Sequence, residues 1–229
     1  MLAKKKKLSK KEIKEDKLVT TFYEAKSYYE KNRTMIFAVT GAIIVIIFAV
    51  LFFTNKTKEN DLLASVELSR VVNTYNAGLY QQAIDGKEGT QEIGLLKIVD
   101  EFSGTEQGEL ARIYLANAYF YTEQYEKAME EYDNYSGSDN LMISAALAGI
   151  ASCYEVKNDF ANAAKYFSKA ADVSKFVPSN PDYLLNAGIN LIKIENYKEA
   201  KVVLNKIKNK YTTAPASRQV DRYLAQLKN

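Results

Sequence analysis

The sequence predicts an all-α protein in which one N-terminal membrane-spanning helix precedes a solenoid of helical hairpins. Three observations support this prediction. An uncharged, mostly apolar run spans residues 35–53. Beyond it, helix-forming sequence is divided by short breaks rich in Gly, Ser, Asp and Pro, without strand signals. One hairpin pattern also occurs three times in that region.

The N-terminal segment, residues 1–34, is basic. Through Arg33 it carries eleven Lys or Arg against five Asp or Glu, a net charge of +6, so the total of +3 leaves −3 for the remainder. A nucleic-acid-binding domain needs its basic charge on the folded surface to neutralise phosphates. This division of charge therefore argues against nucleic acid as a partner.

The same segment has helical features. Ser9 and Glu12 have the spacing of a capping box. Four apolar or aromatic residues recur at helical intervals. They are Leu18, Phe22, Ala25 and Tyr29. Three interpretations stay open: a helix that docks on a partner, a helix that lies on acidic lipid, and a tail that only sets membrane topology.

The apolar run 35–53 predicts an uncleaved membrane anchor. Its nineteen residues would form a helix of about 28 Å, enough to cross the hydrocarbon core of a bilayer. A cleaved signal peptide would have a shorter apolar core, little sequence before it and small residues at its end. Here a long polar segment precedes the run, and bulky Leu51, Phe52 and Phe53 end it.

The flanking charges predict the direction of the anchor. Lys26, Lys31 and Arg33 precede it, whereas Lys56 and Lys58 are followed by acidic residues. Lys and Arg are retained on the cytoplasmic side. We therefore expect a cytoplasmic N-terminus, a polar linker at 54–60 and a domain on the opposite side of the membrane.

The three repeats align without gaps and predict a common core. Each has a small residue in its first helix, then an aromatic residue, an alanine three residues later and a large apolar residue in its second helix. The alanines recur at intervals of 35 and 37 residues. In that order the residues are Ala116, Tyr125, Ala128 and Tyr132; Ala151, Phe160, Ala163 and Phe167; and Gly188, Tyr197, Ala200 and Leu204.

Small residues let two helices approach closely, and the aromatic rings fill the space where one hairpin leans on the next. We expect all these positions in the core of a domain at 61–229. Its predicted parts are a degenerate repeat at 61–108, repeats at 109–143, 144–180 and 181–214, and a capping helix at 215–229. The capping helix places Val220, Tyr223, Leu224 and Leu227 on one face.

This pattern resembles the tetratricopeptide repeat family over roughly residues 109 to 214. The likeness departs from the family where its first helix usually has tryptophan, because Arg112, Leu147 and Leu184 stand there. The closing proline is displaced to Pro178 and Pro215. The resemblance implies a solenoid whose concave side, lined by the first helices, holds a peptide or helix of a partner.

Superposing the repeats on the family's inward-pointing positions gives a candidate partner groove. For its apolar members, packing against a further helix is an equal alternative to partner contact. The candidates are Asn117, Phe120, Tyr121, Ser152, Glu155, Ile189, Ile192 and Lys193.

Catalysis is not expected. The chain has no histidine, the commonest general base and metal ligand near neutral pH. Its one cysteine, Cys153, lies in an apolar helical run and is expected to be a buried small hydrophobe. Adjacent carboxylates such as Glu130 and Glu131 point about 100° apart on a helix and cannot converge as acid and base. We expect no catalytic residue, cofactor, metal or small-molecule substrate.

The order of segments along the chain resembles that of the YfgM-like family, whose members are ancillary subunits of the bacterial Sec translocon. A charged segment ending in YYEKNR, one anchor and an acidic repeat domain opening with LLASVEL carry the likeness. It implies a place in the inner membrane, with the repeats in the periplasm linking the channel to chaperones or exported clients. A scaffold for outer-membrane assembly, cell division or polysaccharide export would have the same layout and stays the alternative.

Overall fold

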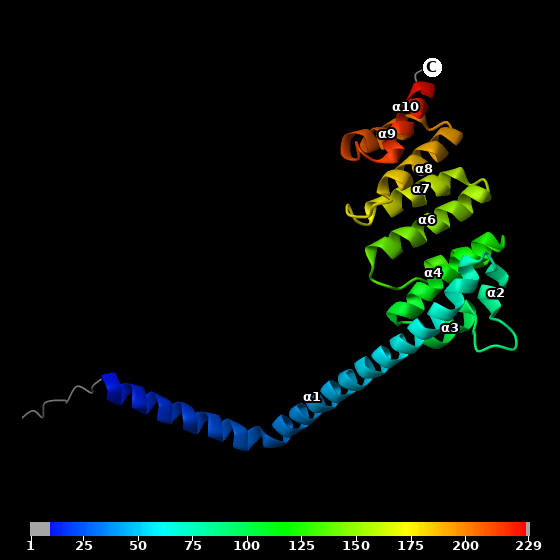
Figure 1. Ribbon diagram of the computed structural model, residues 1–229. Coiled ribbons are helices and arrows are strands. Elements are labelled where there is room, and N and C mark those ends of the chain that lie inside the picture. The colour runs from blue at the N-terminus through cyan, green and yellow to red at the C-terminus, as the bar shows by residue number, and fades with distance from the viewer. Residues whose placement is uncertain (1–9, 228–229) are drawn as a thin grey trace, which may run out of the picture. The chain divides into compact units, whose positions relative to one another are not determined.

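The computed structural model describes the backbone of residues 10–227 and the side chains from Lys17 onward. The capping box predicted at Ser9 and the end of the predicted capping helix lie outside the described residues. Every regular element in the described range is a helix, which confirms the all-α fold class. The helices are α1 (Lys10–Asn76), α2 (Tyr80–Asp85), α3 (Leu95–Phe102), α4 (Glu106–Tyr121), α5 (Tyr125–Asp133), α6 (Asn140–Val156), α7 (Phe160–Asp172), α8 (Asn180–Lys193), α9 (Tyr197–Lys210) and α10 (Pro215–Gln226) (Figure 1).

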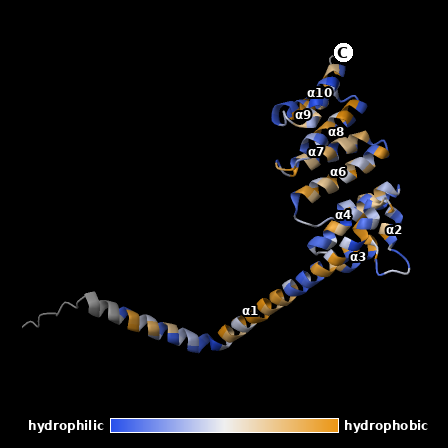
Figure 2. Cartoon of the chain, in the orientation of Figure 1, coloured by the Kyte–Doolittle hydropathy of each residue, from blue (hydrophilic) through white to orange (hydrophobic). Residues whose placement is uncertain are grey.

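The chain forms two units, residues 1–56 and 57–229, and α1 passes from the first into the second. In the first unit the run 35–53 is helical, and its side chains are exposed except for the half-buried Ile36. Figure 2 shows this run as the apolar part of α1. Among the described residues, α1 is the one helix long and apolar enough to cross a membrane.

The helical stripe predicted before this run is also part of α1. Leu18 is 66% exposed, Phe22 64% and Tyr29 45%. These side chains therefore present an apolar surface within the first unit.

The linker predicted at 54–60 is helical, and α1 continues through it without a break. Its sequence, TNKTKEN, is polar but contains neither proline nor glycine. Lys and Glu are good helix formers, and polarity alone does not end a helix. The helix instead ends at Asn76, because Gly78 lies just beyond it with a φ of +76°, which favours glycine.

The region predicted as a degenerate repeat, 61–108, contains three helical pieces where the sequence predicted a pair. The end of α1 supplies a buried face of Ala64, Leu68 and Val71, and the short helices α2 and α3 pack beside α4. The Asp61 carboxylate accepts a hydrogen bond from the Gln107 N–H at 2.8 Å. The end of α1 is thus tied to the first turn of α4.

Three hairpins come next, formed by α4 with α5, α6 with α7, and α8 with α9. Each hairpin packs on the next in chain order (Figure 1). Side-chain caps begin several of these helices: Thr105 accepts from the Gly108 N–H, and Asp139 accepts from the N–H groups of Leu141 and Met142. These local signals explain where α4, α6, α7 and α9 begin.

The turn inside each hairpin has the same backbone form. Glu123, Asn158 and Glu195 each adopt a φ near +60° two residues before the second helix. The three hairpins are therefore alike in backbone geometry as well as in residue pattern.

Most predicted core positions are buried. The three repeat alanines, Ala128, Ala163 and Ala200, are fully buried, as are Ala116 and Ala151. The large residues of the second helices, Tyr132, Phe167 and Leu204, are at most 5% exposed.

Tyr197 was expected in the core but is 46% exposed. The equivalent Phe160 is covered by the next hairpin, since the Lys193 ammonium lies 4.4 Å from its ring centroid. Beyond α9 the described chain has a single helix, so no complete hairpin leans on Tyr197. That helix, α10, buries Val220, and Leu227 just beyond it is buried as well; Tyr223 and Leu224 pack on the same cluster.

Candidate functional site

The eight residues predicted to form a groove lie in the C-terminal halves of the first helices, α4, α6 and α8. Tyr121 and Lys193 are exposed, and the other six are half-buried. The structure brings Phe120 beside Tyr121 and brings Glu155 into contact with Lys193. The set therefore divides into an aromatic part on α4 and a charged part that joins α6 to α8.

The aromatic part is tied into the domain. The Tyr121 ring stacks on Tyr80 of α2 at a centroid distance of 4.6 Å, and Phe120 meets the Tyr125 ring at 5.5 Å. Asn117 accepts a 2.6 Å hydrogen bond from the Tyr132 hydroxyl. Burial raises the pKa of Tyr132 above its usual value, so this hydroxyl stays a donor.

The charged part links neighbouring hairpins. The Lys193 ammonium is 2.8 Å from the Glu155 carboxylate, and both side chains are about one-third exposed. Ser152 donates to the Ala148 carbonyl, as helical serines often do. Ile189 and Ile192 are half-buried and pack against the C-terminal core cluster.

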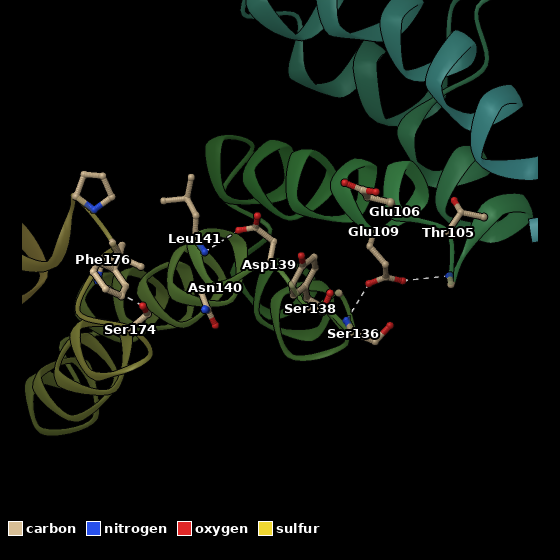
Figure 3. A pocket seen from close by; sticks show the side chains of 15 residues that line it. Thr105, Glu106, Glu109, Ser136, Ser138, Asp139, Asn140, Leu141, Ser174 and Phe176 are labelled. Atoms are coloured by element: carbon tan, nitrogen blue, oxygen red, sulfur yellow. Dashed lines mark hydrogen bonds between the residues drawn. The ribbon is translucent and has the colours of Figure 1, made fainter. Parts of the chain in front are cut away.

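A hollow lies at the other ends of the hairpins, away from the eight predicted groove residues, where one hairpin connects to the next. Its volume is about 890 Å³, in the range of ligand-binding pockets. The loops after α3, α5 and α7 and the first turns of α4 and α6 form its wall, and we call it the edge pocket (Figure 3). Its fifteen residues are Gly104, Thr105, Glu106, Glu109, Tyr135, Ser136, Gly137, Ser138, Asp139, Asn140, Leu141, Ser174, Phe176, Val177 and Pro178.

Glu109 holds two of these loops in place. Its carboxylate, 5% exposed, accepts from the Ser136 N–H at 2.8 Å and from the Gly104 N–H at 3.3 Å. The Arg112 side chain lies close by, with Nε 3.5 Å from Glu109 and Nη1 2.7 Å from Glu131 of α5. The 3.5 Å approach is a charge contact and lacks hydrogen-bond geometry. Arg112 stands at one of the positions where tetratricopeptide repeats usually have tryptophan.

The edge pocket was not predicted from the sequence. Its loops were recognised there only as the breaks SGTEQG, SGSDN and VPSNP. The equal placement of these breaks after successive second helices is the signal that could have indicated it, because solenoid loops at equivalent positions line up along one edge.

Cys153 is fully buried, and burial raises the pKa of its thiol to about 12. The thiolate is the reactive form, so we expect the folded protein to resist a thiol reagent such as dithionitrobenzoate at pH 8. Reaction should be complete once urea unfolds the domain. Rapid reaction in the absence of urea, detected by absorbance, would contradict the buried placement. Within residues 17–227 no three His, Cys, Asp or Glu side chains converge as metal ligands do.

Two comparisons with known proteins bear on this arrangement. A model of the tetratricopeptide repeat-like domain matches residues 26–179. The matched range begins before the apolar run of α1 and extends through α7 to the residue before α8. A search of curated proteins found no match.

Proposed function

The chain belongs to the tetratricopeptide repeat-like family, and we propose that it is a single-pass membrane protein whose repeat domain binds other proteins without chemistry of its own. One observation carries this proposal. The family match covers the apolar run of α1 together with the hairpins up to α7. A single family model thus covers both the apolar run and the repeats, as expected of a binding module that is tethered to a membrane.

The charges around the anchor support a direction. Lys26, Lys31 and Arg33 precede the apolar run, and the longer basic segment adds to their effect. We propose a cytoplasmic N-terminus in the inner membrane of a bacterium, with the domain from residue 57 onward in the periplasm.

Within this role, the layout supports an ancillary subunit of the Sec translocon that links the channel to periplasmic chaperones or exported clients. The support is the resemblance of the charged segment, the single anchor and the acidic repeat domain to the YfgM-like family. A scaffold for another envelope process, such as outer-membrane assembly, cell division or polysaccharide export, is the alternative.

Crosslinking in the native membrane tests the proposal. We would identify proteins crosslinked to tagged full-length chain by mass spectrometry, beside a control in which residues 1–58 are replaced by an unrelated anchor. The junction must keep helical register, because α1 continues to Asn76. We expect translocon subunits and chaperones with the natural chain and loss of the channel subunits after the swap.

A second variant separates the anchor from the repeats. Tyr121→Ala removes the exposed ring of the aromatic part while leaving the anchor intact. Chaperones or clients that bind the first helices should decrease, whereas channel subunits should remain. Recovery of one assembly or division complex equally with the natural and the swapped anchor would overturn the translocon role and support the alternative scaffold.

A further inference from the structure

We propose that the edge pocket is a second binding site, which takes an extended peptide segment carrying Lys or Arg next to a bulky apolar residue. This inference rests on the proposed function of protein binding but uses a surface distinct from the predicted groove. One end of the pocket is apolar and the other is acidic, and among the described residues no Lys or Arg lines it.

The apolar end exposes a phenylalanine. Phe176 is 81% exposed, and Leu141, which also lines the pocket, is 42% exposed. Burying a phenylalanine side chain is favourable, so leaving it in water loses that stabilisation. Exposed apolar groups that share a hollow mark a binding site more often than single scattered ones do.

The backbone fixes Phe176 in this exposed position. The Asn180 amide donates to the Ser174 carbonyl at 2.7 Å, and the N–H of Val177 donates to the same carbonyl at 3.3 Å. The Ser174 hydroxyl in turn accepts from the Phe176 N–H at 3.3 Å (Figure 3). Val177 is buried beneath the loop. A loop tied in this way presents the ring to solvent as part of its structure.

Three carboxylates line the pocket: Glu106 and Glu109 toward its acidic end, and Asp139 nearer its middle. Glu109 is buried and is engaged by Arg112 and two backbone N–H groups. Asp139 caps α6 through the Leu141 and Met142 N–H groups but is exposed, as is Glu106. Burial is the main cause that raises the pKa of Tyr135, and the negative charges of all three carboxylates raise it further. The three carboxylates therefore act together on the pocket. A negative hollow of this kind attracts Lys or Arg.

A cation near the pocket lies at its apolar rim, where the Lys175 ammonium is 5.0 Å from the Phe176 ring centroid. In Figure 3, Phe176 lies at one end of the row of labelled residues and Glu106 and Glu109 lie toward the other end, with Asp139 between them. The charge pattern therefore favours a peptide whose basic residue reaches Glu106 and Asp139 while its apolar residue covers Phe176.

The pocket's size limits the occupant. A volume of about 890 Å³ accommodates a few residues, as peptide and ligand sites do, and not the surface of a folded domain. An extended segment also has backbone groups to pair with the polar loop residues Ser136, Ser138 and Asn140 of the wall.

Fluorescence anisotropy with full-length protein in detergent micelles tests this site. The probe is a labelled peptide of about nine residues, made of Gly and Ser with two Lys beside one Phe. One comparison peptide has Glu in place of both Lys, and another has Ser in place of Phe. We expect each comparison peptide to bind at least tenfold more weakly, and the affinity of the Lys–Phe peptide to fall as salt increases.

Two variants locate the binding. Phe176→Ser removes the apolar contact, and Glu106→Gln with Asp139→Asn removes two charges while keeping an Asn cap on α6. Each should raise the Kd of the Lys–Phe peptide about tenfold. The matched controls are Val202→Ser, another exposed apolar residue, and Glu195→Gln, an exposed acid in the α8–α9 turn. Both should leave the Kd unchanged.

Equal Kd values for the Lys and Glu peptides, no effect of Phe176→Ser, or no saturable binding of the Lys–Phe peptide would each overturn the inference. If the peptide fails but crosslinking still recovers partners, only the edge pocket is wrong. If the peptide binds as expected while crosslinking recovers no partner dependent on the anchor or on Tyr121, the pocket stands and the wider role fails.

Discussion

Arg112→Met is expected to lower the free energy of unfolding of the repeat domain by about 3–5 kcal/mol. The substitution keeps a similar volume but leaves the buried Glu109 carboxylate without its cation and removes the 2.7 Å pair with Glu131. Breaking a buried ion pair from one side costs this much because the remaining charge stays in a poorly solvated place. Urea unfolding of the full-length protein in micelles, monitored by the near-ultraviolet circular dichroism of its tyrosines, measures the change.

The matched control is Lys97→Met, which breaks the exposed pair of Lys97 with Glu101 on α3. An exposed pair one helical turn apart contributes about 0.3–0.5 kcal/mol, so this variant should be nearly as stable as the natural chain. Equal small losses for both variants would show that Arg112 does not compensate Glu109. Adding Glu109→Gln to Arg112→Met should restore part of the loss, because the uncompensated charge is then gone.

Gly149→Ala is expected to destabilise the domain by about 1–3 kcal/mol, although alanine is the better helix former. A Cβ atom at this position in α6 would overlap the ring of Tyr132, which is only 5% exposed. The ring would have to move away from Asn117 and weaken their hydrogen bond. This overlap outweighs the helix preference, which favours alanine by about 1 kcal/mol.

A double-mutant cycle checks the cause. The atoms in conflict are the outer ring atoms of Tyr132, Cζ, Cε1 and Cε2, which leucine lacks. In the Tyr132→Leu background, Gly149→Ala should therefore be neutral or stabilising, a reversal of sign that thermal unfolding would reveal. A loss of the same size in both backgrounds would rule out the ring as the cause.

The repeated part of the fold could be predicted because its signals are local. Helical periodicity, the small residues at Ala116, Ala151 and Gly188, and the alanines three residues after each aromatic recur at one spacing. These patterns predicted helical hairpins, and the structure has them. Tyr197 departed from the prediction because its environment depends on the elements C-terminal to α9, not on its own repeat.

The helix boundaries near the anchor could not be predicted in the same way. Residues 54–60 are polar, and a polar segment with good helix formers continues a helix when nothing in the backbone stops it. The actual stop is near Gly78, which adopts a positive φ. Polarity is a weaker signal for a helix end than backbone geometry.

The edge pocket could not be predicted because its parts come from three loops far apart in the sequence. Thr105, Asp139 and Phe176 meet only through the stacking of successive hairpins. The exposure of Phe176 is a tertiary property as well, since a phenylalanine next to Val177 and Pro178 has the composition of a buried segment. The predicted first-helix set could be chosen by alignment, but its internal contacts, such as Glu155 with Lys193, required coordinates.

The left-handed residues Glu123, Asn158 and Glu195 have a consequence for how this domain can change over time. A side chain in that conformation costs about 1–2 kcal/mol relative to glycine, and somewhat less for asparagine. The domain thus carries three exposed sites, outside the predicted groove set and the edge pocket, where one substitution to glycine would add stability. Mutations that remodel a binding surface at some cost to the fold can be offset at these turns, which leaves the protein room to acquire new partners.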